Sequence, residues 1–215
     1  MSTVQITAAS IEDAMIPSDI YANYNYGGST GLGLGCGSPA SRIFRFVMRL
    51  DETEIPDGVL TGFRVRMTRT SHANSQNGNT LEAYIIKSAN DWVEGTTGGG
   101  APESGACCWN YAKYTSQSWA GSAGCGTSGT DYDADASPPS FSYSSYTTGP
   151  DVPISIELDP AWPTAWRDGR DNEGILFKAN DEVSSLTQIF FHSTEGTTPP
   201  YFEIDYASKI FMVSF

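Results

Sequence analysis

The sequence predicts an all-β sandwich with long Gly/Ser-rich loops and one short helix. Short segments alternate apolar and polar residues, which is the period of a strand with one buried face. The 22 glycines and 12 prolines among 215 residues indicate many turns. The 10 Phe, 11 Tyr and 5 Trp supply large side chains for a core, although apolar residues make up only 39% of the chain.

Two consecutive segments show the alternation most clearly. Residues 43–50 place Phe44 and Phe46 on one face and arginines on the other. After a Pro-Asp-Gly turn, residues 63–67 repeat the pattern with Phe63 and Val65 inward. We therefore expect these four side chains to point into the gap between two packed sheets.

The rest of the chain adds further elements, giving about eight to ten strands. Strands are expected at residues 81–87, 154–158, 175–178, 188–192 and 201–206. Residues 160–168 predict a short helix with Trp162 and Trp166 on one face. The Gly/Ser-rich residues 95–150 form a loop too long to be structureless in a compact domain, so Trp109 and Trp119 are expected to pin it to the sandwich.

No internal repeat or linker divides the chain, so residues 1–207 are expected to form one domain. Residues 208–215 are an apolar tail. Exposed apolar segments pair readily with sheet edges, so the tail either inserts into a neighbouring subunit or caps its own core. The interaction residues would be Ile210, Phe211, Val213 and Phe215.

The net charge of −13, with a pI of about 4.3, works against binding nucleic acid through its phosphates. No apolar run is long enough to span a membrane. No secretory signal is visible after Met1, so the chain either lost a leader or leaves the cell without one. We expect a location outside the cell or on a virion surface.

The four cysteines fit no compact zinc pattern, since no C-x-x-C is present and the histidines number only two. Two interpretations stay open. Cys107 or Cys108 bridges to Cys125 and staples the loop, or these thiols and Cys36 are free, as expected after assembly in a reducing cell.

Seven segments between residues 8 and 206 follow one another in the order of a known family. They are Asp13 to Pro17 with Asn23 to Gly27 and Leu32 to Gly35, Arg42 to Leu50 with Ile55 to Gly58, Tyr84 to Glu94, Trp109 and Asn110 with Trp119, Leu158 to Trp166, Asn172 to Lys178, and Phe191 to Ser193 and Glu195 with Pro200 to Ile204. In this order they resemble the DNRLRE family, also called disaggregatase-related, which includes alginate-type carbohydrate-binding modules. The resemblance implies a jelly-roll sandwich without catalytic machinery, of a kind found in surface, polysaccharide-associated and phage-borne proteins.

Two sets of residues are candidates for binding a ligand. Half of all basic residues fall within residues 42–69, which makes that region about +2 and the remainder about −15. If the two strands are neighbours, Arg45, Arg49, Arg64 and Arg66 form a cationic strip suited to carboxylates; otherwise they are paired internally. The second set is the loop aromatics, on which sugar rings could stack, namely Tyr24, Tyr26, Tyr111 and Trp119.

A structural Ca²⁺ is the one cofactor that the sequence suggests. Calcium takes six to eight hard oxygen ligands. Glu12 and Asp13 near the start and Asp205 near the end would meet where the first and last strands pair. No nucleophile–base pattern or phosphate loop is present, and the paired acids fall at predicted turns, so we expect no enzyme.

Taken together, the sequence predicts a non-enzymatic structural, decoration or adhesion protein of a virion or other extracellular assembly. Its expected partners are other subunits of that assembly, including copies of itself in a homo-oligomer. The alternative is a secreted carbohydrate-binding module for an acidic polysaccharide.

Overall fold

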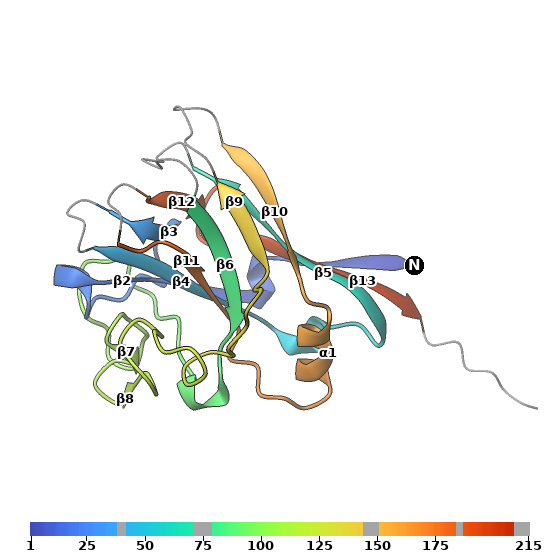
Figure 1. Ribbon diagram of the computed structural model, residues 1–215, viewed down its shortest axis with the longest axis horizontal. Coiled ribbons are helices and arrows are strands. Elements are labelled where there is room, and N and C mark those ends of the chain that lie inside the picture. The colour runs from blue at the N-terminus through green and yellow to red at the C-terminus, as the bar shows by residue number, and fades with distance from the viewer. Residues whose placement is uncertain (38–41, 71–78, 144–150, 184–186, 209–215) are drawn as a thin grey trace, which may run out of the picture.

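The computed structural model describes residues 1–37, 42–70, 79–143, 151–183 and 187–208 (Figure 1). These residues form thirteen strands and one α-helix, α1 (Ala161–Arg167), so the all-β prediction is confirmed. Short 3₁₀ turns lie at Ala8–Ser10, Asp19–Tyr21, Glu52–Glu54 and Ser88–Asn90. The strands are β1 (Ser2–Ile6), β2 (Ile11–Pro17), β3 (Gly31–Cys36), β4 (Ile43–Leu50), β5 (Gly58–Arg69), β6 (Asn79–Ile85), β7 (Tyr111–Lys113), β8 (Gln117–Ser118), β9 (Ser140–Tyr143), β10 (Val152–Leu158), β11 (Ile175–Ala179), β12 (Ile189–His192) and β13 (Tyr201–Ser208).

The strands pair in antiparallel fashion around two long central strands. In sheet A, β5 pairs with β10, β12 and β13, and β13 pairs in turn with β1. In sheet B, β4 pairs with β2 and β11, and β11 continues to β6 and β9. Strand β3 joins the sheets, because it pairs with β12 and with β4. The result is a β-sandwich-like arrangement with continuous hydrogen bonding through β3.

The core lies between the two sheets, where the alternating residues meet. Phe44 and Phe46 of β4 and Phe63 and Val65 of β5 all belong to one buried cluster, as the pattern predicts. The Phe46 ring lies 6.1 Å from the ring of Phe191, so β4 of sheet B and β12 of sheet A are in direct contact. Buried apolar area of this kind is the main stabilising contribution to such a fold.

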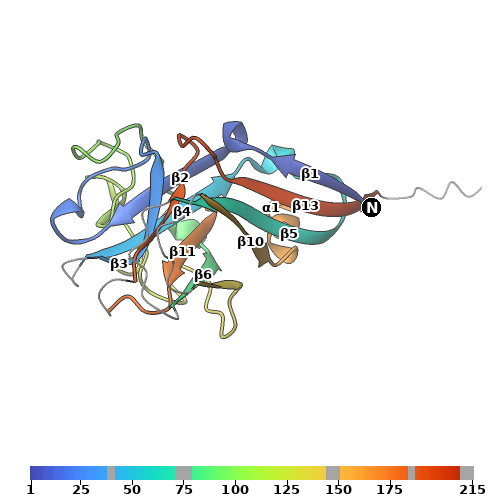
Figure 2. The same cartoon turned by 90° about the horizontal axis from the view of Figure 1, so that it is seen from above.

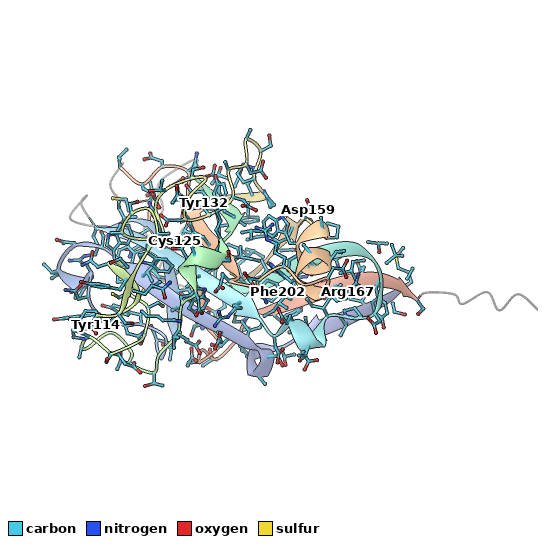
Figure 3. The ribbon with its side chains drawn as sticks, turned by 90° about the horizontal axis from the view of Figure 1, so that it is seen from below. Tyr114, Cys125, Tyr132, Asp159, Arg167 and Phe202 are labelled. Atoms are coloured by element: carbon cyan, nitrogen blue, oxygen red, sulfur yellow. The ribbon has the colours of Figure 1, made fainter. Side chains whose placement is uncertain are left out.

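A second layer covers the outer face of sheet B, and we call it the loop layer (residues 86–134). Ile16 of β2, Val47 of β4 and Leu176 of β11 are completely buried beneath it. Those three strands are therefore buried on both faces, which is unusual for an antiparallel sheet. The side chains that the loop layer buries against the sheet are Ile86, Trp92, Cys107, Ala112, Trp119, Cys125 and Tyr132. Cys125 and Tyr132 are labelled in Figure 3.

A buried carboxylate organises the loop layer from inside. Asp131 accepts hydrogen bonds from the backbone N–H groups of Gly121, Ser122 and Thr127, at 2.6, 3.0 and 2.7 Å. The Asn90 side chain donates to the Asp131 carbonyl at 3.0 Å and so connects the 3₁₀ turn at Ser88–Asn90 to this residue. These bonds satisfy backbone groups that a long loop would otherwise leave unpaired, so the Gly/Ser-rich stretch takes a defined conformation.

Helix α1, which confirms the short helix predicted at residues 160–168, closes one end of the sandwich. Trp166 is 2% exposed and its ring meets that of Phe63 edge-to-face at 6.1 Å, while Trp162 packs at the margin of the same core. The Arg167 guanidinium donates to the Pro56 and Gly58 carbonyls at 3.0 and 2.9 Å, which fixes the helix to the turn before β5. Figure 3 shows Arg167 near the end opposite to Tyr114.

Strands β1, β13 and β5 run together to the end of the molecule where the N-terminus lies (Figure 2). Ser2 of β1 pairs with Tyr206 of β13, and Ser208 pairs with Gly58 of β5. The predicted tail begins beyond Ser208, and its residues Ile210, Phe211, Val213 and Phe215 lie outside the described residues. The helices of the described residues are all too short or too polar to cross a lipid bilayer.

Candidate functional site

The four arginines predicted to bind a ligand lie on two different sheets. Arg45 and Arg49 belong to β4 in sheet B, whereas Arg64 and Arg66 belong to β5 in sheet A. β4 and β5 follow each other in the chain, but the described residues show no pairing between them. The single cationic strip required neighbouring strands, so the structure does not form it.

Arg45 is buried, 7% exposed, and holds the loop layer on sheet B. Its guanidinium makes a two-pronged ion pair with Glu182, at 2.8 and 2.7 Å, and donates to the Gly124 carbonyl at 2.6 Å. It also lies over the Trp109 ring at 5.0 Å. Burial alone would lower the pKa of Arg45, but the bonds to Glu182 outweigh burial and raise it. Arg45 is thus a structural tie, with each of its three guanidinium nitrogens already hydrogen-bonded within the chain.

Arg49 plays a similar part at the other end of β4. It donates to Glu12 at 2.8 Å and to Glu173 at 3.4 Å, and its guanidinium lies 5.0 Å from the Trp92 ring. It also donates to the Trp92 carbonyl at 3.2 Å. Glu12, predicted as a metal ligand, is therefore the ion-pair partner of Arg49 and fixes β2 to β4.

The pairing at Glu173 gives a pH dependence that can be measured. Burial, reinforced by Asp91, raises the pKa of Glu173 to about 7 even though Arg49 opposes it. The folded state thus prefers protonated Glu173, and its contribution to stability falls as the pH rises from about 4.5 to about 7. We expect Glu173→Gln to gain roughly 1–3 kcal/mol relative to the natural chain between pH 5 and pH 8.

Urea unfolding at the two pH values measures this gain. Glu157→Gln serves as the control, because the Glu157 side chain is 72% exposed and should show a flat difference. An equal pH slope in the natural chain and in Glu173→Gln would contradict the assignment.

Arg64 and Arg66 are neutralised on sheet A by the strand beside them. Arg66 donates to Glu203 at 2.8 Å, and Arg64 contacts both Glu203, at 3.3 Å, and Asp205. Burial would raise the pKa of Glu203, but the hydrogen bonds from Arg66 and Gln5 outweigh it and lower the pKa. The interpretation of a paired, partly solvated sheet face therefore holds for these arginines.

The predicted tyrosines fall in two half-buried groups. Tyr24 and Tyr26 both meet the Tyr21 ring edge-to-face, with centroids 5.9 and 6.4 Å away. Tyr111 meets Tyr114 in the same manner at 5.4 Å. Edge-to-face contacts of this kind fix the orientation of each ring relative to its neighbour, so both tyrosine groups are ordered.

The two tyrosine groups are joined through the loops that carry them. The Asn110 side chain donates to the Asn23 side chain at 2.8 Å, and the Asn110 N–H donates to the Ala22 carbonyl at 3.0 Å. We call this joined region the tyrosine surface, made of Tyr21, Tyr24, Tyr26, Tyr111 and Tyr114. It lies at the end that carries β7 and β8, away from α1 (Figures 1 and 3).

Trp119 is not part of that surface. It is 4% exposed and its indole N–H donates to the Cys108 carbonyl at 3.0 Å inside the loop layer. A ring buried in this way cannot stack on a sugar, so the ligand-binding prediction for Trp119 is wrong and its role as a pin is confirmed. The sequence analysis missed the most deeply buried pin, Trp92, which is 0% exposed.

A hollow with an apolar wall lies beside β12. Its volume is about 650 Å³. His192 on its wall contacts Asp151 at 3.1 Å, and Phe190 supplies an aromatic face. None of the predicted ligand-binding residues lines this hollow.

The three acids predicted to share a metal do not meet. Asp205 of β13 pairs with Arg64 of β5, and Glu12 of β2 pairs with Arg49 of β4. The first strand does pair with the last, but Asp13 belongs to β2, which lies in sheet B. Asp13 instead lies next to two acids that the sequence analysis quoted only within the family resemblance, Glu94 and Glu195.

All four cysteines are buried thiols that form no disulfide. Burial raises the pKa of Cys107 and of Cys125, which keeps both as neutral thiols. The structure therefore has the free-thiol alternative rather than a disulfide staple, and the loop layer is held by packing and hydrogen bonds instead.

No protein-family model and no curated protein matches this chain. Its class is therefore defined by its own structure. It is an all-β, β-sandwich-like protein whose outer sheet face carries an ordered loop layer and a tyrosine surface.

Proposed function

We propose that this protein is a non-enzymatic jelly-roll module that serves as a structural, decoration or adhesion subunit of a virion or other extracellular assembly. The tyrosine surface carries the proposal. Tyrosine is enriched at protein interfaces, because its ring offers a large contact area and loses little conformational freedom on binding. Ring contacts and the Asn23–Asn110 bond orient this surface in advance, which lowers the entropic cost of association.

The state of the arginines favours assembly over the alternative of an acidic-polysaccharide module. That alternative needs free guanidinium groups for carboxylates. Arg45 and Arg49 are engaged on sheet B, and Arg64 and Arg66 on sheet A, by acids of this same chain. A polyuronate would have to displace these pairs, whereas a protein partner can use the tyrosine rings directly.

The proposal predicts self-association that depends on the tyrosine surface. We expect the full chain to form a homo-oligomer, and the double variant Tyr24→Ala/Tyr111→Ala to weaken it at least about tenfold, since interface tyrosines often contribute more than 1 kcal/mol. Sedimentation and light scattering measure the association. Tyr201→Ala, a half-buried tyrosine on sheet A, is the matched control.

Two further measurements separate the alternatives. A chain ending at Ser208 tests whether the tail residues Ile210, Phe211, Val213 and Phe215 bind a neighbouring subunit or cap the core of their own chain. An unchanged melting temperature with lost assembly supports binding to a neighbour. Loss of folding contradicts it. A glycan array and an alginate gel test the alternative. A strictly monomeric chain that retains acidic polysaccharide selectively would overturn the assembly proposal.

A further inference from the structure

Three acidic residues from distant parts of the chain converge beside sheet B. Asp13 lies on β2, Glu94 in the loop layer and Glu195 in the turn after β12. One carboxylate oxygen from each lies within 4.8 Å of the other two. Three carboxylates at this separation repel one another strongly when ionised, particularly where water is partly excluded.

Backbone hydrogen bonds hold two of these carboxylates in place, and the Thr194 hydroxyl donates to the third, that of Glu195, at 3.0 Å. The Thr194 N–H donates to Asp13 Oδ2 at 2.8 Å, and the Asp13 N–H donates to Glu94 Oε1 at 2.7 Å. Among the described residues, no lysine, arginine or histidine forms an ion pair with any of the three acids. The arrangement therefore concentrates negative charge, which Arg49 offsets only from beyond ion-pair distance through its attraction for Glu94.

One oxygen of the cluster is left without a partner. Asp13 is 0% exposed, and its Oδ1 is buried with no hydrogen-bond donor in the described structure. Its other oxygen already accepts from Thr194. A buried carboxylate oxygen that lacks a donor is costly unless a proton or a metal ion occupies it.

We propose that Asp13, Glu94 and Glu195 bind a divalent cation, and that this cation is Ca²⁺. All the donors are hard carboxylate oxygens, which Ca²⁺ prefers, and the site offers no imidazole or thiolate of the kind that zinc and soft metals favour. Calcium also tolerates irregular coordination better than Mg²⁺. Glu195 is exposed, so water can reach the ion from that side and complete its shell.

The cation would act as a cross-link between three segments. It would join β2 of sheet B to the loop layer through Glu94 and to the turn after β12 through Glu195. Neighbouring polar contacts tie the connection between β2 and β3 to two of these segments: the Asn25 side chain donates to the Cys107 carbonyl of the loop layer at 3.0 Å, and Ser193 after β12 donates to the Ser29 carbonyl at 2.5 Å. Bound Ca²⁺ would therefore stabilise the loop layer on the sandwich.

The competing occupant is a proton. Burial, together with the neighbouring acids, raises the pKa of Asp13 to about 8 and that of Glu94 to about 7. Neutral Asp13 would remove the repulsion without a metal. The two occupants respond differently to added calcium, which makes them distinguishable.

The test uses the full chain, stripped with EGTA and then titrated with CaCl₂ or MgCl₂ at pH 7.5. Calorimetric titration should show one Ca²⁺ site, and scanning calorimetry should show a saturable rise in melting temperature, because a ligand of the folded state stabilises it. Mg²⁺ should give a weaker response. Glu195→Gln, an exposed change that preserves folding, should weaken Ca²⁺ binding at least tenfold, and Asp13→Asn should abolish it.

Glu157→Gln removes an exposed acid on sheet A and is the matched control; its calcium response should equal that of the natural chain. The proposal is overturned if the natural chain shows no calcium response at millimolar concentration. It is equally overturned if Glu195→Gln responds as the natural chain does. A natural chain whose melting temperature ignores calcium but rises with acidification would show that the proton is the occupant.

Discussion

Replacing Arg45 with alanine is expected to lower the free energy of unfolding by about 3–5 kcal/mol, because it breaks a buried ion pair and leaves its partner with only a 4.0 Å contact to Lys178. The charge left behind is that of Glu182, whose side chain is 12% exposed. The same change removes the donor to the Gly124 carbonyl and the cation over the Trp109 ring. Arg45→Ala should therefore destabilise sheet B and the loop layer together.

The local backbone adds to the importance of this tie. Gly124 has φ of +75°, and its N–H donates to the Trp109 carbonyl. A Cβ at Gly124 would lie 2.7 Å from the Trp109 ring. The chain must therefore pass close under the tryptophan, and Arg45 holds the carbonyl of that same glycine.

Chemical denaturation followed by tryptophan fluorescence measures the loss. Arg66→Ala is the matched control: its side chain is 38% exposed, and Arg64 still contacts Glu203 in its absence, so the expected loss is below about 1 kcal/mol. A double-mutant cycle with Glu182→Gln isolates the pair itself. Equal losses for Arg45→Ala and Arg66→Ala would show that Arg45 is not the structural tie described above.

Local pattern was sufficient to predict much of the fold. The strand at residues 43–50 and the helix near residues 160–168 appear where the sequence places them. Alternation identifies which side chains share a face, because successive side chains in a strand point to opposite sides. Short strands such as β7 and β8 were missed because three or two residues carry no period.

The arginine strip failed for a different reason. Periodicity predicts the face on which Arg45 and Arg64 lie, but it does not say which sheet each strand joins. That choice depends on pairing between segments far apart in the chain, such as β5 with β13. The acidic cluster could not be predicted for the same reason, since Asp13 and Glu94 are 81 residues apart and only the folded chain brings them together.

The sequence contains a pattern that indicates the loop layer, namely apolar residues on the outer face of sheet B, but the arginines of β4 made that face look solvated. Arg45 and Arg49 suggested a solvated outer face for β4, but Val47 stands between them, and β2 carries Ala14 and Ile16 on its outer face. Apolar residues on both faces of neighbouring strands indicate burial on both sides. A covering segment was therefore required, and the tryptophans of the long loop supply it.

Trp92 is the strongest test of that covering layer. It is among the largest fully buried side chains, it donates its indole N–H to the Glu173 carbonyl at 2.8 Å, and Arg49 lies on its ring. Trp92→Ala should lower the free energy of unfolding by about 3–5 kcal/mol through lost burial and the cavity left behind. Trp92→Phe keeps most of the bulk and leaves a carbonyl without its donor, so we expect a loss of about 1–3 kcal/mol.

Hydrogen exchange resolves where the stability is lost. Trp162→Ala on α1, a half-buried tryptophan outside the loop layer, is the control and should leave exchange in residues 87–134 unchanged. Faster exchange confined to residues 87–134 in Trp92→Ala would define the loop layer as a separate cooperative unit. Faster exchange in β2, β4 and β11 as well would mean that sheet B depends on its cover, because Ile16, Val47 and Leu176 would then face water. Unchanged exchange in both regions would contradict the role assigned to Trp92.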